Sequence, residues 1–380
     1  MAKIGVVSIY DMNNVGNRVQ SYALCRALER LGHTPVVIPN QPYPGWTEPT
    51  PDGSAPQPVP GSTQESVLDT ARRLVASGDW WGLGEKARRM VVMLARVPEL
   101  RRFTQQNMSV DPRHILAPGD GEQLRDSYDA FVVGSDQVWN PDYRFGCPTD
   151  FLRFAHPHQR IAYAASVGRS DLSSGWTAHF REMLTDFGPI SVRERTGVEL
   201  IRPLVDQPVD LTLDPTLLLP VDEWHRLADR APRRSPGPFL ATYLLWTGDR
   251  PTYRGVAASA RRLGLRTRHL MSPGPRPPRF YGVESFLRTI RDAEAVVTDS
   301  FHSTLFAILF RTPVRVLSRG PGQDDRIESL LALFGASSAE AFGPSYDPPT
   351  APLVHHPDQV LAGARHRSLA WLGRAIDGAL

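Results

Sequence analysis

Residues 3–39, KIGVVSIYDMNNVGNRVQSYALCRALERLGHTPVVIP, decide the fold. The stretch opens with a β-branched run, 3–10, and closes with a second one, 35–39, each typical of a strand. Between them, 18–33 spaces its apolar side chains three and four residues apart, which indicates one face of a helix, and Gly32 supplies a C-terminal stop. A strand, a turn, a helix and a strand in this order form a βαβ unit, from which parallel α/β sheets are built.

The same alternation continues along the chain. Further apolar runs are typical of strands: 128–136, 161–168, 188–194, 239–246, 266–271, 295–299 and 313–318. A break rich in proline and arginine, 230–238, interrupts them. We therefore expect an α/β fold of two doubly wound, Rossmann-like domains, 1–230 and 238–350, followed by an amphipathic helix in 351–380. Because such sheets bind ligands beyond the carboxyl ends of their strands, we expect the chemistry in the strand-to-helix turns, facing a central cleft.

The composition predicts a globular protein with no integral membrane segment. Of the 380 residues 41% are hydrophobic, and no apolar run approaches the ~20 residues that a membrane span needs. The short N-terminal apolar run lacks a following cleavage site, so we interpret it as a strand rather than a signal peptide. Two cysteines, Cys25 and Cys147, are too few for a disulfide framework or a zinc cage, which favours a reduced, cytoplasmic protein.

The charge pattern argues against a nucleic-acid partner. The formal net charge is only +3, and the basic stretches 230–234 and 261–269 lack interleaved aromatic residues. One segment, 42–62, is dense in proline, glycine and serine and predicts a loop. This loop is either a lid or a tolerated insertion, and we favour the insertion. Helical stretches are expected after it, near 64–77 and 82–106.

The turn NNVGNR, 13–18, follows the first expected strand. Asn14, Gly16 and Asn17 permit a tight turn, and the helix N-terminus behind them attracts anions. The motif is neither a GxGxxG fingerprint nor a P-loop, so it does not by itself predict a nucleotide site. The same residues would also serve simply to build the turn.

Two later turns leave similar alternatives open. In GSDQVWN, 134–140, Asp136 either orients a substrate hydroxyl or caps the next turn. In SVRE, 191–194, the guanidinium of Arg193 either grips a carboxylate or phosphate, or pairs internally with Glu194 or another acid.

The segment AVVTDSFHSTLFAILF, 295–310, places a histidine in the first turn of an expected helix. Ser300 caps that helix in the structural interpretation, and His302 is then an ordinary polar residue. In the chemical interpretation, the positive helix N-terminus keeps His302 neutral in the free protein, and a bound phosphate favours its charged form. A histidine whose protonation follows its ligand is suited to acid–base catalysis.

Together these segments resemble the polysaccharide pyruvyl transferase family, from about residue 3 to residue 335. Six motifs occur in the family's order: NNVGNRVQSYAL, VVGSDQVWNP, IAYAASVG, ISVRERTG, LDPTLLLPVDEW and VVTDSFHSTLFAIL. The resemblance implies a GT-B-like shape, with the acceptor on the N-terminal domain and the donor on the C-terminal one. It also implies transfer of the enolpyruvyl group of phosphoenolpyruvate to a sugar diol, giving a pyruvate ketal and phosphate. Phosphoenolpyruvate is then a co-substrate, and no metal or other cofactor is needed.

The resemblance assigns roles to individual residues. His302 matches the acid–base histidine of the family, and Arg193 matches an arginine that holds the anionic donor. Asp136 is a second candidate base. The other expected contacts are Ser300, Ser303 and Arg326 to the donor, and Asn14, Gly16, Asn17 and Gln137 to the carbohydrate-like acceptor.

The chain departs from the family pattern at one position. Characterised members carry Arg-x-His where this chain has Ser300-Phe301-His302. A lost charge-assisted contact is worth roughly 1.5–3 kcal/mol. The candidates to replace it are Arg169, Arg315, Arg319 and Arg326. The departure leaves two alternatives open, namely another transferase on this scaffold, such as a nucleotide-sugar glycosyltransferase, and a non-catalytic saccharide-binding protein.

Overall fold

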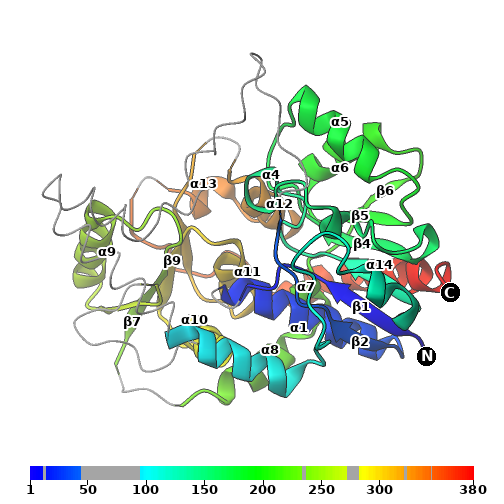
Figure 1. Cartoon of the computed structure of the whole chain (residues 1–380). Helices are drawn as coiled ribbons and strands as arrows, with labels where there is room; N and C mark the ends of the chain where they lie inside the picture. The colour runs from blue at the N-terminus through cyan, green and yellow to red at the C-terminus, as the bar shows by residue number, and fades with distance from the viewer. Residues whose placement is uncertain (12–13, 44–94, 233–236, 272–281, 321–322, 344) are drawn as a thin grey trace, which may run out of the picture. The chain divides into compact units, whose positions relative to one another are not determined.

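A computed structural model describes the chain except for residues 12–13, 44–94, 233–236, 272–281, 321–322 and 344 (Figure 1). The chain forms two compact units. Unit 1 comprises Met1–Gly78, Thr104–Leu219 and Gly363–Leu380, and unit 2 comprises Asp79–Phe103 and Pro220–Ala362. The expected loop 42–62 and helix 64–77 lie outside the described residues, apart from 42–43. Of the expected helix 82–106, only a helical part at 95–107 is described.

Unit 1 is built on a six-stranded parallel sheet with the order β2-β1-β3-β4-β5-β6. Its strands are β1 (Lys3–Val7), β2 (Thr34–Val37), β3 (Ala130–Val133), β4 (Arg160–Ala165), β5 (Ile190–Val192) and β6 (Val209–Leu211). The four inner strands are buried almost throughout, as expected for a sheet covered on both faces. The hydrophobic core beside this sheet includes Phe131, Trp139 and Phe151.

The helices of unit 1 follow its strands. They are α1 (Val15–Arg30), α4 (Pro141–Arg144), α5 (Ser174–Met183), α6 (Arg195–Ile201) and α7 (Pro215–Leu218), with short 3₁₀ turns at Glu122–Ser127, Pro148–Phe151, Pro157–Gln159 and Arg202–Leu204. The C-terminal helix α14 (Pro357–Asp377) returns to this unit, where the indole of Trp371 donates to Asp210 at 2.8 Å. Helix α14 lies within the range 351–380, and residues 363–380 belong to unit 1 rather than forming a separate part.

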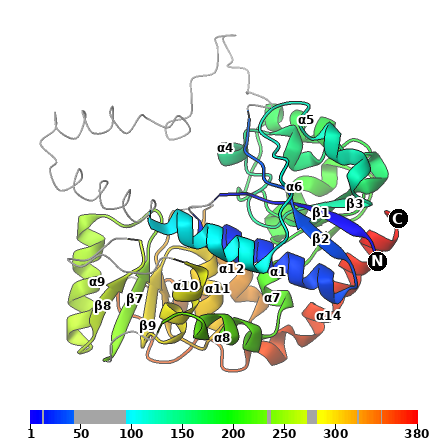
Figure 2. The ribbon, with the colours of Figure 1, turned by 60° about the horizontal axis from the view of Figure 1, so that its bottom comes forward.

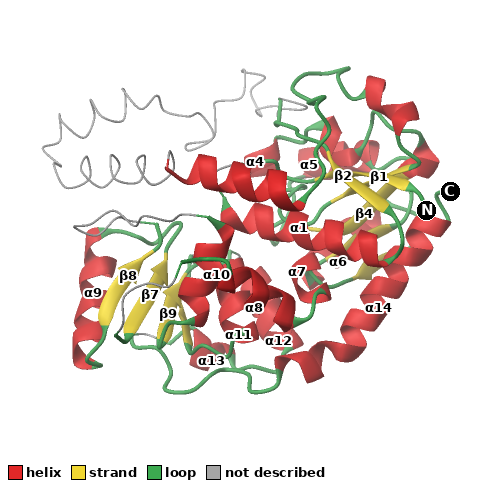
Figure 3. Cartoon of the chain, turned by 90° about the horizontal axis from the view of Figure 1, so that it is seen from below, coloured by secondary structure: helices red, strands yellow, loops and turns green. Residues whose placement is uncertain are grey.

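Unit 2 contains a four-stranded parallel sheet with the order β10-β9-β7-β8. Its strands are β7 (Phe239–Tyr243), β8 (Arg266–His269), β9 (Ala295–Thr298) and β10 (Val314–Val316). Its helices are α8 (Val221–Asp229), α9 (Arg250–Arg262), α10 (Val283–Arg291), α11 (Phe301–Leu309), α12 (Asp325–Leu333) and α13 (Ser338–Ala341). In Figures 2 and 3, α9 lies on the opposite side of the strands from α10 and α11. Helix α8, which precedes the expected break at 230–238, packs against α10 in this unit.

Each sheet has a switch point, where the strand order reverses. In unit 1 the chain runs from β1 out to β2 and then returns to β3 on the other side of β1. In unit 2 it runs from β7 out to β8 and returns to β9 on the other side of β7. Ligands of doubly wound sheets bind beyond the carboxyl ends of the strands at such points. The loops that follow β1, β3, β7 and β9 are therefore the places to look for a site.

Candidate functional site

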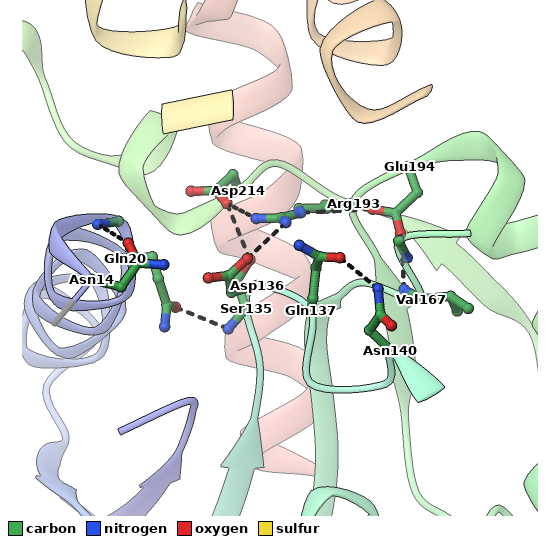
Figure 4. A network of polar contacts seen from close by, with 12 residues as sticks. Asn14, Gln20, Ser135, Asp136, Gln137, Asn140, Val167, Arg193, Glu194 and Asp214 are labelled. Carbon is green, nitrogen blue, oxygen red and sulfur yellow. Dashed lines mark hydrogen bonds and ion pairs between the residues drawn. The ribbon is translucent and has the colours of Figure 1, made fainter. Parts of the chain in front are cut away.

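Arg193 lies just after β5 in unit 1, inside a cluster of acidic side chains (Figure 4). Its guanidinium donates to Asp214 at 2.8 Å and to Asp136 at 3.1 Å. The Glu194 carboxylate lies 3.6 Å from its Nε. The Arg193 side chain is only 2% exposed, so these charges interact with little screening by water.

This cluster determines the charge state of Arg193. Burial disfavours the charged guanidinium, but Asp136, Asp214 and Glu194 outweigh that effect and raise the pKa of Arg193 above its ordinary value. Of the two alternatives for SVRE, the internal ion pair is therefore present. A contact of Arg193 with the donor stays a prediction.

Asp136 joins the cluster to the loop after β3. Its backbone has φ 67°, in the left-handed region that non-glycine residues seldom adopt and that is often found at functional sites. The residue before it, Ser135, donates from Oγ to Asp214 at 3.1 Å. The backbone N–H of Ser135 also donates to the side chain of Gln20 at 3.1 Å, which ties the loop after β3 to α1 across the switch point.

The start of α1 lies at the same switch point. The helix begins at Val15, three residues earlier than its periodicity predicted, because Asn14 caps it by accepting from the N–H of Gly16 at 2.9 Å. Gly16 and Asn17 are consequently buried in the first helical turn rather than in the loop. Gln137 lies on the β3 side, where its side chain accepts from Asn140 at 2.6 Å.

In unit 2, α11 begins at the carboxyl end of β9. Ser300 is the N-cap, and its side chain accepts from the N–H of Ser303 at 3.4 Å, which confirms the capping interpretation. His302 is 6% exposed and its ring packs edge-on against that of Phe301, with centroids 5.2 Å apart. The Ser303 hydroxyl is buried and has no hydrogen-bond partner among the described residues. Whether these residues contact a donor stays a prediction.

Asp299 organises the neighbouring loop of unit 2. Its carboxylate accepts from the backbone N–H groups of Leu245, Trp246 and Thr247, at 2.7, 2.7 and 2.8 Å. These three groups follow β7, so one side chain fixes the loop of one strand to the end of its neighbour across the switch point. The carboxylate also accepts a hydrogen bond from the Thr247 hydroxyl at 3.1 Å.

The four candidate replacements for the missing family arginine differ in the contacts that their side chains make. Arg315 donates to three backbone carbonyls, those of Glu340, Ala341 and Asp347. Arg169 belongs to unit 1 and forms ion pairs with two aspartates there, at 3.3 and 3.9 Å.

The other two arginines follow β10. Arg326 is half-buried in the first turn of α12. The guanidinium of Arg319 lies 4.7 Å from the centre of the Trp246 ring, and that tryptophan is 56% exposed. The backbone of Trp246 is held by Asp299, the residue before the N-cap of α11. Arg319 is therefore joined through Trp246 to the segment that carries His302.

Several residues of these clusters were not singled out from the sequence. Asp214 lies in the motif LDPTLLLPVDEW. It is the N-cap of α7, where its Oδ1 accepts a hydrogen bond from the N–H of Thr216 at 3.0 Å. This capping position is the signal that could have marked it. In the sequence, Asp299 marks only the end of the apolar run 295–299. Arg18, in α1, and Ser166, just after β4, carry buried polar atoms but have no distinctive sequence signal.

The described residues contain neither a cluster of metal ligands nor a membrane-spanning helix. Within the described residues, no three histidine, cysteine, aspartate or glutamate side chains are grouped as ligands for a metal ion. In the same part of the chain, no helix has the length and apolar character needed to cross a membrane.

Comparison with known proteins identifies the family. The family model for polysaccharide pyruvyl transferase matches residues 14–321, which include every candidate site residue except Arg326. The chain belongs to the polysaccharide pyruvyl transferase family. This polysaccharide pyruvyl transferase-like protein is accordingly a transferase. No curated protein matches it significantly in sequence.

Solved glycosyltransferase structures are distantly similar to this pyruvyl transferase family member. SnogD from Streptomyces nogalater shares 13% identity, with 99% of this chain and 97% of that chain covered and a TM-score of 0.36. Os79 from O. sativa, solved with UDP and deoxynivalenol-3-glucoside, shares 11% identity over 98% and 95% of the two chains, with a TM-score of 0.33. UGT2 from Phytolacca americana shares 11% identity over 99% and 94%, with a TM-score of 0.34. The identification rests on the family match and not on these neighbours.

Proposed function

We propose that this protein transfers the enolpyruvyl group of phosphoenolpyruvate to two hydroxyls of a carbohydrate acceptor, forming a pyruvate ketal and releasing phosphate. The observation that carries the proposal is the position of His302. It lies in the first turn of α11, at the carboxyl end of β9 and at the switch point of unit 2. A donor phosphate at this helix start would meet the backbone N–H groups of its first turn and the positive end of the helix dipole.

The proposed reaction begins with a proton transfer to carbon. His302, charged once the phosphate is bound, gives its proton to the methylene carbon of phosphoenolpyruvate. The adjacent carbon becomes an oxocarbenium-like centre, which one acceptor hydroxyl attacks. Preorganised donors at the start of α11 stabilise the negative charge of the phosphate throughout.

The second half of the reaction closes the ketal. The carbon–oxygen bond to phosphate breaks, and the second hydroxyl attacks the same carbon. Of the two hydroxyl protons, one restores His302 and the other leaves with phosphate, so the proton count balances. Asp136, which forms an ion pair with Arg193 at 3.1 Å, is the alternative base for the first hydroxyl in this proposal.

Arg319 is the arginine best suited to the donor in this proposal. Arg315 is committed to backbone carbonyls, whereas Arg319 is stacked on the exposed Trp246. Its Nε is buried and finds no hydrogen-bond partner in the described part of the chain. A guanidinium in this state has a donor available for a carboxylate or phosphate oxygen.

The test is phosphate release from phosphoenolpyruvate with and without a sugar diol. Methyl galactoside offers free hydroxyls at positions 4 and 6, and its 4,6-di-O-methyl derivative is the matched control. We expect phosphate release with the diol alone, together with a product whose mass spectrum shows the added pyruvyl group. Equal release with both sugars would indicate hydrolysis. Turnover of a nucleotide sugar in place of phosphoenolpyruvate would indicate a glycosyltransferase.

A further inference from the structure

Arg18 places a buried guanidinium at the switch point of unit 1. It is the fourth residue of α1, but its side chain turns back past the start of the helix. Its NH2 group donates to the carbonyl of Ile9 at 2.8 Å, and its guanidinium carbon lies 4.6 Å from the centre of the Tyr10 ring. Ile9 and Tyr10 follow β1, so the charge lies between the end of β1 and the first turn of α1, whose N–H groups have no acceptor within the helix.

The hydrogen bonding of this guanidinium is incomplete. Arg18 is 0% exposed, yet its Nε and NH1 atoms have no hydrogen-bond partner among the described residues. No ion pair between Arg18 and a carboxylate is found in that part of the chain. Desolvation lowers the pKa of Arg18 to about 10. A buried cation with unsatisfied N–H groups is costly, and such groups in a native protein call for a ligand, an ion or water.

Other buried arginines of unit 1 show the contrast. Arg144 donates to both carboxylate oxygens of Asp150, at 2.8 and 2.7 Å. Arg193 pairs with Asp136 and Asp214. These arginines hold the fold together through internal acids. Arg18 has comparable burial, but no carboxylate of the described residues forms an ion pair with it, and Asp11 favours its charge only from a greater distance.

Asn17, the residue before Arg18 in α1, carries a second unsatisfied group. Its side chain is buried in the first turn of α1, and its Oδ1 has no hydrogen-bond partner among the described residues. The oxygen accepts hydrogen bonds, whereas the guanidinium donates them. A ligand that carries both a hydroxyl and a negative group would satisfy the pair.

We propose that Arg18 and Asn17 bind the acceptor saccharide through an anionic group, a phosphate or a carboxylate, next to a hydroxyl. The assignment of this ligand as the acceptor rests on the proposed pyruvyl transfer. The binding itself does not, because it requires neither phosphoenolpyruvate nor turnover. The anion would be held by the Arg18 guanidinium and by the positive start of α1.

The test is calorimetric titration of the full chain, without phosphoenolpyruvate, with three sugars. Glucose 1-phosphate carries a phosphate, glucuronate carries a carboxylate, and methyl glucoside is neutral. The variants are Arg18→Met and Arg18→Lys. Arg26→Met is the matched control, since Arg26 is on the same helix, has a side chain that is 41% exposed, and is paired with Glu29.

We expect the wild type and Arg26→Met to bind one charged sugar at least tenfold more tightly than methyl glucoside. The sugar that is preferred identifies the anion. Arg18→Met should lose the preference, and Arg18→Lys, which keeps the charge but loses Nε, should retain part of it. The melting temperature of ligand-free Arg18→Met should not fall, because the variant removes an unsatisfied buried charge.

Two results would overturn the proposal. In the first, the wild type binds charged and neutral sugars equally, or binds none of them. This result rejects an anion site at Arg18 even if a variant does not fold. The second is a folded Arg18→Met that keeps the preference, since the anion would then bind elsewhere. Failure of phosphoenolpyruvate turnover would reject the proposed function and leave this result standing.

Discussion

The carboxylate of Asp299 accepts a hydrogen bond from the backbone N–H of Trp246 at 2.7 Å, across the switch point of unit 2. The contact joins the loop after β7 to the residue that precedes the N-cap of α11. It belongs to a set of four hydrogen bonds to the same carboxylate, from residues 245–247. One acidic side chain therefore holds both Trp246, on which Arg319 stacks, and the turn that leads to His302.

Asp299→Asn should loosen this loop. An amide retains only one acceptor oxygen and no charge, and hydrogen bonds to charged groups are worth about 1.5–3 kcal/mol. We expect a loss of about 2 kcal/mol in the unfolding free energy of unit 2 and faster hydrogen exchange at the amides of residues 245–247. Exchange mass spectrometry measures this, with the exposed substitution Glu328→Gln as the control. Unchanged exchange at these amides would contradict the assigned role.

Arg193→Met should destabilise unit 1 strongly. The variant leaves Asp136, Asp214 and Glu194 buried without their common countercharge, and breaking a buried ion pair in this way costs about 3–5 kcal/mol. Urea denaturation measures the loss. Arg195→Met, an exposed substitution two residues along the chain, is the control and should cost little. Similar small losses in the two variants would show that the acidic cluster contributes little to the fold.

His302→Asn should abolish most of the turnover and leave the fold intact. Removal of a general acid–base residue typically lowers the rate by 10²–10⁴-fold. Asparagine keeps a polar side chain in the first turn of α11, so phosphoenolpyruvate binding should persist. His355→Asn, at an exposed position of the same unit, is the control. Phosphate release by His302→Asn at a near-wild-type rate would remove His302 from the mechanism.

Acidification should destabilise unit 2 through His269. This side chain is half-buried at the end of β8, and its Nδ1 is hydrogen-bonded to the Thr242 hydroxyl at 2.7 Å. Desolvation lowers the pKa of His269 to about 4. Between pH 6.5 and 4 the unfolded chain therefore binds a proton that the folded chain does not, so stability falls as the pH falls.

The expected loss from His269 between pH 7 and pH 5 is about 1–2 kcal/mol. Urea titrations at both pH values should show a smaller pH-dependent loss in His269→Gln than in the wild type. His356→Gln, an exposed substitution in the same unit, should behave as the wild type does. An equal loss in all three proteins would contradict the burial argument.

The sequence predicted most of the secondary structure because apolar patterning follows burial. The runs 3–10 and 239–246 contain β1 and β7, although each strand ends three residues earlier, where the chain leaves the sheet. The start of α1 was placed too late, since Val15, Gly16 and Asn17 have low helix propensity and the Asn14 cap fixes the helix instead. Strand β6 was not singled out, because it is short and lies at the edge of its sheet.

The site was less predictable than the fold. The turns that carry Asp136, Arg193 and His302 could be found from the strand ends alone. Which side chains meet could not be found, since Arg193 and Asp214 are brought together only by the pairing of β5 with β6. The same holds for Arg319 and Trp246, which follow strands on opposite sides of β9.

Phosphoenolpyruvate binding by calorimetry tests the central claim most directly. We predict that the wild type binds phosphoenolpyruvate with micromolar to low-millimolar affinity and does not bind UDP-glucose. Arg319→Met should weaken the binding about tenfold, the equivalent of one charge-assisted contact, whereas Arg261→Met, an exposed substitution in the last turn of α9, should leave it unchanged. Binding of UDP-glucose with no binding of phosphoenolpyruvate would contradict the account and identify a different donor.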